Sequence, residues 1–168
     1  WQKSRQWEIL SSNFQPVSEV VEVPPEYEVA MEAALGPRLQ MLLESKVENK
    51  SDGSEALLAV DYLKTQRAGR SSFYMGFYTG GSSSDLSLSE ARSGVPAGEG
   101  VRALLKEVVG TSEKFQEKYK KSIDYLLDGV VVVDSIHTAL ELRPRYEGWT
   151  FVTPDGDTLT ADGVLTGG

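Results

Sequence analysis

The sequence repeats one order of elements in its two halves, and this repeat restricts the fold more than any other feature. In the first half, residues 17–23, 39–47 and 70–78 are runs rich in β-branched, aromatic and other apolar side chains. Such runs predict strands. Residues 25–35 and 54–66 lie between them and place apolar side chains at helical spacing. The first half therefore predicts strand, helix, strand, helix, strand.

The second half gives the same order. Residues 104–109, 130–133 and 149–153 predict strands, and residues 112–127 and 135–142 predict helices. A repeated order of elements indicates two related modules. We therefore expect an α+β fold made of two similar mixed α/β subdomains, each with its own core.

Residues 79–100 separate the halves and have a different composition. The segment begins with Gly-Gly-Ser-Ser-Ser at 80–84, ends near Gly-Val-Pro-Ala-Gly at 94–98, and shows no apolar period. These features predict a linker or a long surface loop. The expected organisation is a connecting segment at 1–15, subdomain I at 16–78, the linker at 79–100 and subdomain II at 101–168.

The last twenty residues predict a hairpin followed by a glycine-rich end. Pro-Asp-Gly-Asp at 154–157 joins two extended runs, which is a turn signal. Gly163, Gly167 and Gly168 then enclose three residues. Such glycines either turn the backbone or allow another backbone to approach closely. The sequence leaves both interpretations open.

Composition excludes several classes of function. The chain has 168 residues, a formal net charge of -8 and no cysteine. Disulfide scaffolds and cysteine-based zinc sites are therefore excluded. The excess of acidic residues argues against binding DNA over the whole surface, because phosphate neutralisation needs local basic residues. No apolar run approaches the roughly 20 residues of a membrane span.

Several motifs occur in order along residues 16–168 and together point to one family. In chain order they are Val-Pro-Pro-Glu-Tyr at 23–27, Ala-Ala-Leu-Gly-Pro-Arg-Leu-Gln at 33–40, Ala-Val-Asp-Tyr-Leu-Lys at 59–64, Ala-Gly-Arg-Ser-Ser-Phe at 68–73, Tyr-Leu-Leu-Asp-Gly at 125–129 and Gly-Val-Leu-Thr-Gly-Gly at 163–168. The chain thus resembles the hinge domain of SMC (structural maintenance of chromosomes) proteins. It departs from the family where Tyr-Met-Gly at 74–76 replaces the usual continuation.

The resemblance implies a function without covalent chemistry. An SMC hinge dimerises and joins two coiled-coil arms of a chromosome-organising ATPase, which acts in chromosome condensation and segregation. ATP would bind to head domains outside this chain, and we expect no catalytic residue, metal or cofactor here. The pattern looks bacterial, which favours a homodimer in the cytoplasm, associated with the nucleoid. The absence of an initial Met suggests a piece of a longer chain, cut close to the arms.

The resemblance also implies a dimer interface. The terminal glycines match family positions where two chains pack closely, and exposed sheet edges would supply backbone hydrogen bonds to the partner. We expect one edge in each subdomain, so that two contacts close a two-fold ring. The expected interface residues are Gly163, Gly167, Gly168, Arg70, Phe73, Phe151, Val152 and Thr153.

A weak DNA contact is a further expectation, and a nucleic-acid-binding module with secondary dimerisation is the alternative function. Lys114, Lys118 and Lys121 have helical spacing on one face. A solvated helix face is the simpler interpretation of this spacing, and a contact to DNA phosphates is the functional one. Lys3 and Arg5 lie beside Trp1 and Trp7, which would suit stacking on unpaired bases. We favour the alternative that the two tryptophans are contacts of a truncated coiled coil or core residues.

A small enzyme is a third interpretation, and the residues give it little support. His137 is the single histidine, and no Gly-x-Ser-x-Gly nucleophile motif is present. Asp155, Asp157 and Asp162 lack the spacing and the closing glutamate of a calcium loop, so we expect them to serve turns. A cleft that joined His137 to carboxylates would revive this interpretation.

Overall fold

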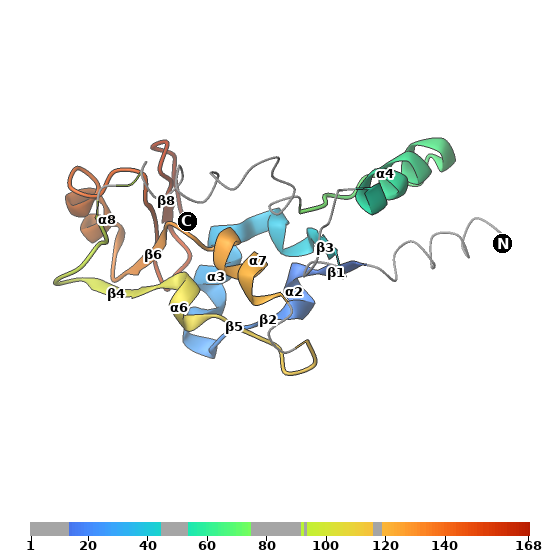
Figure 1. Cartoon of the computed structure of the whole chain (residues 1–168). Coiled ribbons are helices and arrows are strands. Elements are labelled where there is room, and N and C mark those ends of the chain that lie inside the picture. Colours follow the sequence, from blue (N-terminus) through green and yellow to red (C-terminus); the bar gives the residue numbers. More distant parts are fainter. Residues whose placement is uncertain (1–13, 45–53, 75–91, 93, 116–118) are drawn as a thin grey trace. The chain divides into compact units, whose positions relative to one another are not determined.

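The computed structural model describes residues 14–44, 54–74, 92, 94–115 and 119–168 (Figure 1). The chain forms two compact units, and each takes segments from both halves of the sequence. Unit 1 comprises Trp1–Val21, Pro37–Gly80 and Thr111–Ile123, and unit 2 comprises Glu22–Gly36, Gly81–Gly110 and Asp124–Gly168. Helices and strands alternate in both, so the expected α+β class is confirmed. The predicted subdomain boundaries do not coincide with these units and stay a prediction.

Unit 2 contains a five-stranded sheet in the order β4-β6-β7-β8-β9. The strands are β4 (Val101–Leu104), β6 (Val130–Val133), β7 (Thr150–Val152), β8 (Thr158–Leu159) and β9 (Leu165–Thr166). β6 and β7 are parallel, and the other neighbours are antiparallel. The predicted hairpin at residues 154–157 is confirmed between β7 and β8.

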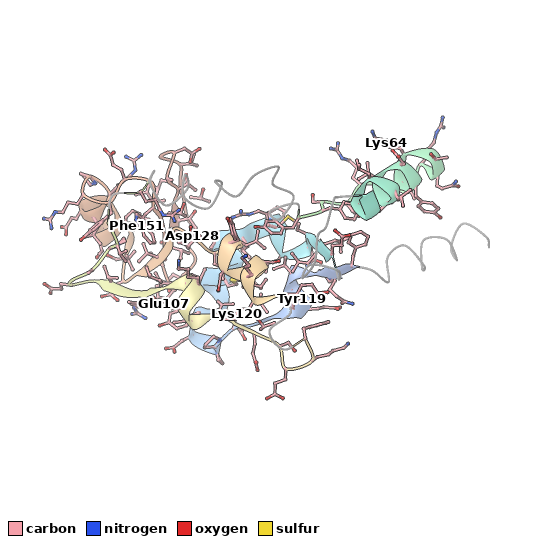
Figure 2. The ribbon with its side chains drawn as sticks, viewed as in Figure 1. Lys64, Glu107, Tyr119, Lys120, Asp128 and Phe151 are labelled. Carbon is pink, nitrogen blue, oxygen red and sulfur yellow. The ribbon has the colours of Figure 1, made fainter. Side chains whose placement is uncertain are left out.

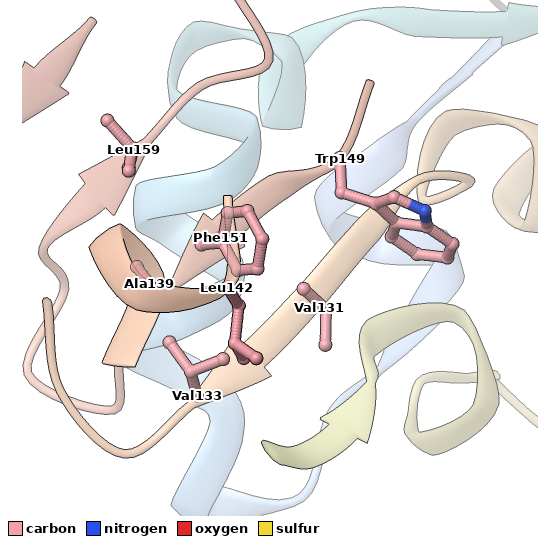
Figure 3. Packing of buried hydrophobic residues seen from close by; sticks show 7 residues of the cluster. All are labelled: Val131, Val133, Ala139, Leu142, Trp149, Phe151 and Leu159. Atoms are coloured by element: carbon pink, nitrogen blue, oxygen red, sulfur yellow. The ribbon is translucent and has the colours of Figure 1, made fainter. Parts of the chain in front are cut away.

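The core of unit 2 forms between this sheet and the helix that joins its parallel strands (Figure 3). That helix, α8 (Ile136–Leu142), begins after Ser135, whose hydroxyl accepts a hydrogen bond from the Thr138 amide. The side chains that meet are Val131, Val133, Ala139, Leu142, Trp149, Phe151 and Leu159. Every residue of β6 is buried, as the run of four valines predicts. The helix α3 (Glu28–Leu35) also packs on β7.

The described residues of unit 1 repeat the first part of this plan with fewer strands. β1 (Phe14–Pro16) pairs antiparallel with β3 (Leu42–Glu44), as β4 pairs with β6. Leu42 then forms a parallel bridge with Phe73, as Val131 does with Phe151. The rings of Phe14 and Phe73 pack edge to face at 5.0 Å, beside Ala56 and Ala59 of α4 (Ser54–Gln66).

The strands predicted at residues 17–23 and 104–109 are wrong at their centres. A single helical turn interrupts each: α2 (Val17–Val20) lies between β1 and β2 (Val21–Glu22), and α6 (Leu105–Val108) lies between β4 and β5 (Gly110–Thr111). β2 and β5 pair with each other. Val17 and Val20 are both fully buried one turn apart. Burying both valines on one side requires helical spacing, so tertiary packing overrides the strand preference of valine.

Other elements agree with the sequence in part. α3 follows a 3₁₀ turn (Pro25–Tyr27) and ends at Gly36, as the prolines and the glycine predict. The strand predicted at 39–47 begins later, at Leu42, because Gly36–Gln40 forms a 3₁₀ helix, and its predicted end at 45–47 lies outside the described residues. On α4, Leu57 is 63% exposed, whereas Ala59 is fully buried. None of the helices that the structure describes is long and apolar enough to cross a membrane.

Candidate functional site at the open edges of the two sheets

The last strand, β9, forms one edge of the unit 2 sheet. Among the residues that the structure describes, it pairs only with β8, with Thr166 opposite Thr158 and Leu165 opposite Leu159. Residues 161–168 are all exposed, and Val164 and Leu165 are 53% and 56% exposed. Figure 1 shows the carboxyl terminus beside β8. An exposed edge strand with apolar side chains can accept another strand.

The backbone of Leu165 faces away from its own sheet. The Thr160 amide donates a hydrogen bond to the Val164 carbonyl over 3.0 Å, so these two residues form a hydrogen-bonded pair. Bonded and non-bonded pairs alternate along antiparallel strands. The next pair, Leu159 and Leu165, is therefore non-bonded, and the N–H and C=O of Leu165 point outward. They offer one donor and one acceptor at the sheet edge.

The three glycines expected at this edge differ in backbone conformation and in the space around them. Gly163 has a φ of +96° in the turn between β8 and β9, and its N–H donates to the Thr160 carbonyl. It therefore serves a turn. A Cβ on Gly167 would lie 2.6 Å from Asp157 Oδ1 of the same chain. Gly168 has a φ of +115°, and a Cβ there would meet open space.

Phe73 forms an edge of the unit 1 sheet. The Leu42 amide donates to the Ser72 carbonyl and the Tyr74 amide donates to the Leu42 carbonyl, each over 2.9 Å. In a parallel ladder this pattern turns the N–H and C=O of Phe73 away from Leu42. Among the residues that the structure describes, no strand pairs with that outer side. Arg70, expected in the same edge, is exposed and precedes the bridge.

The expectation that Phe151, Val152 and Thr153 form an exposed edge is wrong. Phe151 and Val152 belong to β7, which pairs with β6 on one side and β8 on the other. All three residues are at most 2% exposed. The hairpin after Thr153 folds back on β7 and covers its outer side, which makes it an interior strand.

The structure does not place the expected basic residues on one helix face. Lys114 is exposed in a turn, with its ammonium 5.5 Å from the Phe115 ring centroid. Lys121 is exposed on α7 (Lys120–Leu126), which begins later than predicted. Lys3, Arg5 and Lys118 lie outside the described residues.

A charged cluster that sequence reasoning missed lies at the start of β6 and β7. Asp128, labelled in Figure 2, pairs with Arg92 and accepts a 3.0 Å hydrogen bond from Lys106. Burial of the carboxyl opposes its ionisation. The hydrogen bonds and charges of Lys106 and Arg92 outweigh this and hold the pKa of Asp128 below its ordinary value. Arg92 lies in a stretch without periodicity, so no sequence pattern marks it.

His137 and Asp157, for which the sequence predicts no catalytic or metal-binding role, lie on a helix surface and in a turn. His137 is exposed on α8. Asp157 takes part in the β7–β8 turn, where its N–H donates to Thr153 Oγ1 over 3.0 Å. Within the described part of the chain, acidic and histidine side chains form no group of three suited to a metal ion.

Comparison with known proteins identifies the family. Residues 10–143 match the model of the flexible hinge domain of SMC proteins. The chain belongs to the SMC flexible hinge domain family. It is 30% identical over 166 residues to the chromosome partition protein Smc of Methanocaldococcus jannaschii, covering 96% of this chain and 12% of that protein. The chain therefore spans about an eighth of the length of this relative.

Solved SMC hinges share its fold. An asymmetric dimer of the Geobacillus stearothermophilus SMC hinge domain matches with a TM-score of 0.67 and 22% identity, over 99% of this chain and 73% of that one. The Pyrococcus furiosus SMC hinge domain matches with a TM-score of 0.65 and 23% identity, over 99% and 83%. The expected hinge fold is confirmed.

Proposed function

We propose that this SMC hinge is the dimerisation module of a chromosome-organising protein, and that two copies join through their sheet edges. The observation that carries this proposal is the pair of open edges, Leu165 in unit 2 and Phe73 in unit 1. Each presents an outward N–H and C=O. The solved Geobacillus stearothermophilus hinge, described as an asymmetric dimer, supports self-association.

In this arrangement, β9 of one copy pairs with the Phe73 edge of the other. The two edges belong to different units, so the contact is head to tail, and a second equivalent contact closes the ring with two-fold symmetry. Backbone hydrogen bonds would supply the pairing, and the exposed Val164 and Leu165 would add apolar burial. Gly168, which has open space around it, leaves room for the partner backbone.

Sedimentation of the chain over a range of concentrations tests the proposal. Wild type should show twice the chain mass at tens of micromolar. Leu165→Pro removes the outward N–H but fits an edge strand, so the monomer should keep its fold. We expect it to raise the dimer Kd by about tenfold or more, the effect of a lost hydrogen bond plus a poorer edge fit. Gly167→Glu with Gly168→Glu should act in the same direction.

Two controls separate the backbone from the side chain. Leu165→Ala keeps the N–H and should weaken the dimer less than Leu165→Pro. Leu57→Ala removes an equally exposed leucine from α4 and should leave the Kd unchanged. A monomeric wild type at tens of micromolar would disprove dimerisation, and an unchanged Kd for Leu165→Pro would disprove this edge.

A DNA contact is the second candidate function. The segment Thr111–Ile123 of unit 1 carries exposed lysines at 114, 120 and 121, and Lys114 lies over an aromatic ring. Binding of a single-stranded oligonucleotide should weaken with salt. Replacing Lys114, Lys118 and Lys121 with alanine should lower the salt slope by about 0.7 per lost contact. The control replaces the exposed Lys64, Arg67 and Arg145, and an equal loss there would contradict the location.

The remaining roles concern the whole protein. Joined to coiled-coil arms and ATP-binding heads, the dimer would hold two ATPase arms together during chromosome condensation and segregation, in the cytoplasm and at the nucleoid. The hinge would contribute non-covalent association and no chemistry.

A further inference from the structure

The end of the expected linker is attached to unit 2. We call Arg92 and residues 94–100 the strap. The indole N–H of Trp149 donates a 2.9 Å hydrogen bond to the Gly94 carbonyl, and Pro96 is buried. The strap leads directly into β4, which is the edge strand opposite β9 in the sheet order. Its attachment therefore fixes how the chain enters the sheet of unit 2.

The Arg92 side chain makes the most specific of these contacts. Its guanidinium lies 5.3 Å from the centroid of the Trp149 ring and pairs with Asp128 Oδ2. Lys106 Nζ binds the other carboxylate oxygen, Oδ1, over 3.0 Å. Only 12% of the arginine side chain is exposed. A mostly buried guanidinium that stacks on an indole and pairs with a carboxylate is held by two directional interactions.

Gly129 completes the site. Its φ is +78°, and a Cβ there would lie 2.9 Å from Arg92 Nη1 and 3.3 Å from Arg92 Cδ. The arginine therefore lies across a bare backbone position. Any side chain at residue 129 would both strain the backbone and occupy the space of the guanidinium.

The related positions of unit 1 lack this site. The bridges of Leu42 with Phe73 and of Val131 with Phe151 align the two sheets. In that alignment Leu39 stands for Asp128, Gln40 for Gly129 and Ser71 for Trp149. Carboxylate, glycine and indole are all replaced, so the repeat alone does not require the site.

We propose that Asp128, Gly129 and Trp149 form a binding site for a guanidinium group, occupied by Arg92, which latches the strap onto unit 2 and can release it without unfolding the sheet. Release is separable because Arg92 is held by its side chain and Gly94 by one carbonyl that accepts from the Trp149 indole. The Gly100 carbonyl, next to β4, would keep its hydrogen bond from the Asp134 amide. The five paired strands do not depend on them. An open latch would expose the site to an arginine of another chain and free the segment before β4.

Two measurements on the full chain test the latch. Trypsin cleaves after arginine only when the side chain enters its own pocket, so a latched Arg92 resists cleavage of the Arg92–Ser93 bond. In Asp128→Asn this cleavage should accelerate about ten- to a hundredfold relative to cleavage after the exposed Arg70. That range is the effect of losing one charge-assisted hydrogen bond when cleavage follows the open population.

Hydrogen exchange of Arg92→Gln gives the second measurement, since this variant leaves the pair of Lys106 and Asp128 intact. The amides of residues 95 and 97–101 should exchange about tenfold faster or more, above all that of Val101, which donates to the Gly98 carbonyl of the strap. The amides of β6 and β7 should keep their protection. Arg102→Gln is the matched control, because it removes an arginine from an exposed ion pair on the neighbouring β4. It should leave exchange of the strap unchanged.

The outcomes are decisive even where Asp128→Asn loses its fold. Faster exchange confined to the strap of Arg92→Gln supports the latch. Unchanged exchange there, an equal change in Arg102→Gln, or loosening of β6 and β7 together with the strap would each overturn it.

Discussion

The two units start from one plan and end differently. In each, a strand, one helical turn and a second strand lead to an antiparallel partner and then to a parallel phenylalanine. In unit 2 the chain continues into the β8–β9 hairpin, which covers Phe151. Among the described residues of unit 1, no strand pairs with the matching side of Phe73. The same plan therefore gives a closed position in one unit and an open edge in the other.

This difference teaches where association can occur. A hairpin that covers β7 moves the open edge of unit 2 outward to β9. The described residues of unit 1 contain no such hairpin, so the open edge among them stays at Phe73. The predictions below test this contrast by changing equivalent positions.

The largest expected effect is the difference in stability between the variants Phe151→Ala and Phe73→Ala. Phe151 is fully buried in the unit 2 core, so its loss should lower the free energy of unfolding by about 3–5 kcal/mol. Phe73 is partly buried, so Phe73→Ala should lower the free energy of unfolding by less. It should, however, weaken the dimer. Denaturant unfolding and sedimentation measure the two quantities. Equal losses of stability would contradict the contrast.

Placing a leucine at a buried alanine of each unit should give a smaller difference in the free energy of unfolding. Ala139 of α8 and Ala59 of α4 are both fully buried. Ala139→Leu forces a larger side chain among the seven residues of the unit 2 core and should cost about 1–3 kcal/mol. Ala59→Leu faces a smaller cluster and should cost less by the same unfolding measurement. The reverse order would show that unit 1 is the tighter unit.

Acid should weaken the contribution of the Asp128 charge to the free energy of unfolding. Unit 1 has Leu39 at the related position and lacks this charge. The folded pKa lies below the ordinary value of 3.8, so the charge contributes fully above that value. The contribution is lost as pH falls through the folded pKa. Asp128→Asn should therefore cost about 1–2 kcal/mol near neutral pH and nothing in strong acid. Paired unfolding curves across pH measure this. A pH-independent difference would assign the effect to packing.

The smallest effect is expected for the cap of α8. Ser135→Ala removes the hydroxyl that accepts from the Thr138 amide over 3.3 Å and should cost about 1 kcal/mol. Ser135→Asp keeps an acceptor and should restore most of the loss in the same unfolding assay. If Ser135→Asp did not restore stability, the hydroxyl would not stabilise the helix by accepting the hydrogen bond of the Thr138 amide.

Sequence reasoning succeeded where a pattern is strong and local. Four consecutive valines, the Pro-Asp-Gly-Asp turn and the prolines before α3 each determine their element with little help from outside. Sequence reasoning failed at Val17 and Val20. Over four residues, a helical turn differs from a strand only in the spacing of the side chains that are buried together. β9 also escaped prediction, since two residues between glycines carry no alternating pattern.

The candidate site was predicted in part. The terminal glycines and Phe73 point to segments that form sheet edges in the structure, because glycine restricts what a backbone can do and Phe73 belongs to a family motif. Their place in a dimer interface stays a prediction. Phe151–Thr153 was assigned to an edge because a β-branched run looks alike at the centre and at the margin of a sheet. Arg92 and Asp128 lie 36 positions apart, so their meeting is invisible before the chain folds.

The sequence by itself determined the family, the α+β class and the repeated order of elements, because apolar spacing and turn residues act over a few positions. Only the tertiary structure decided which strands are edges, which half supplies each segment of a unit, and that Arg92 binds beside Trp149. Those outcomes depend on contacts between residues far apart in the chain. Burial and hydrogen-bond pairing select them only once the sheets have formed.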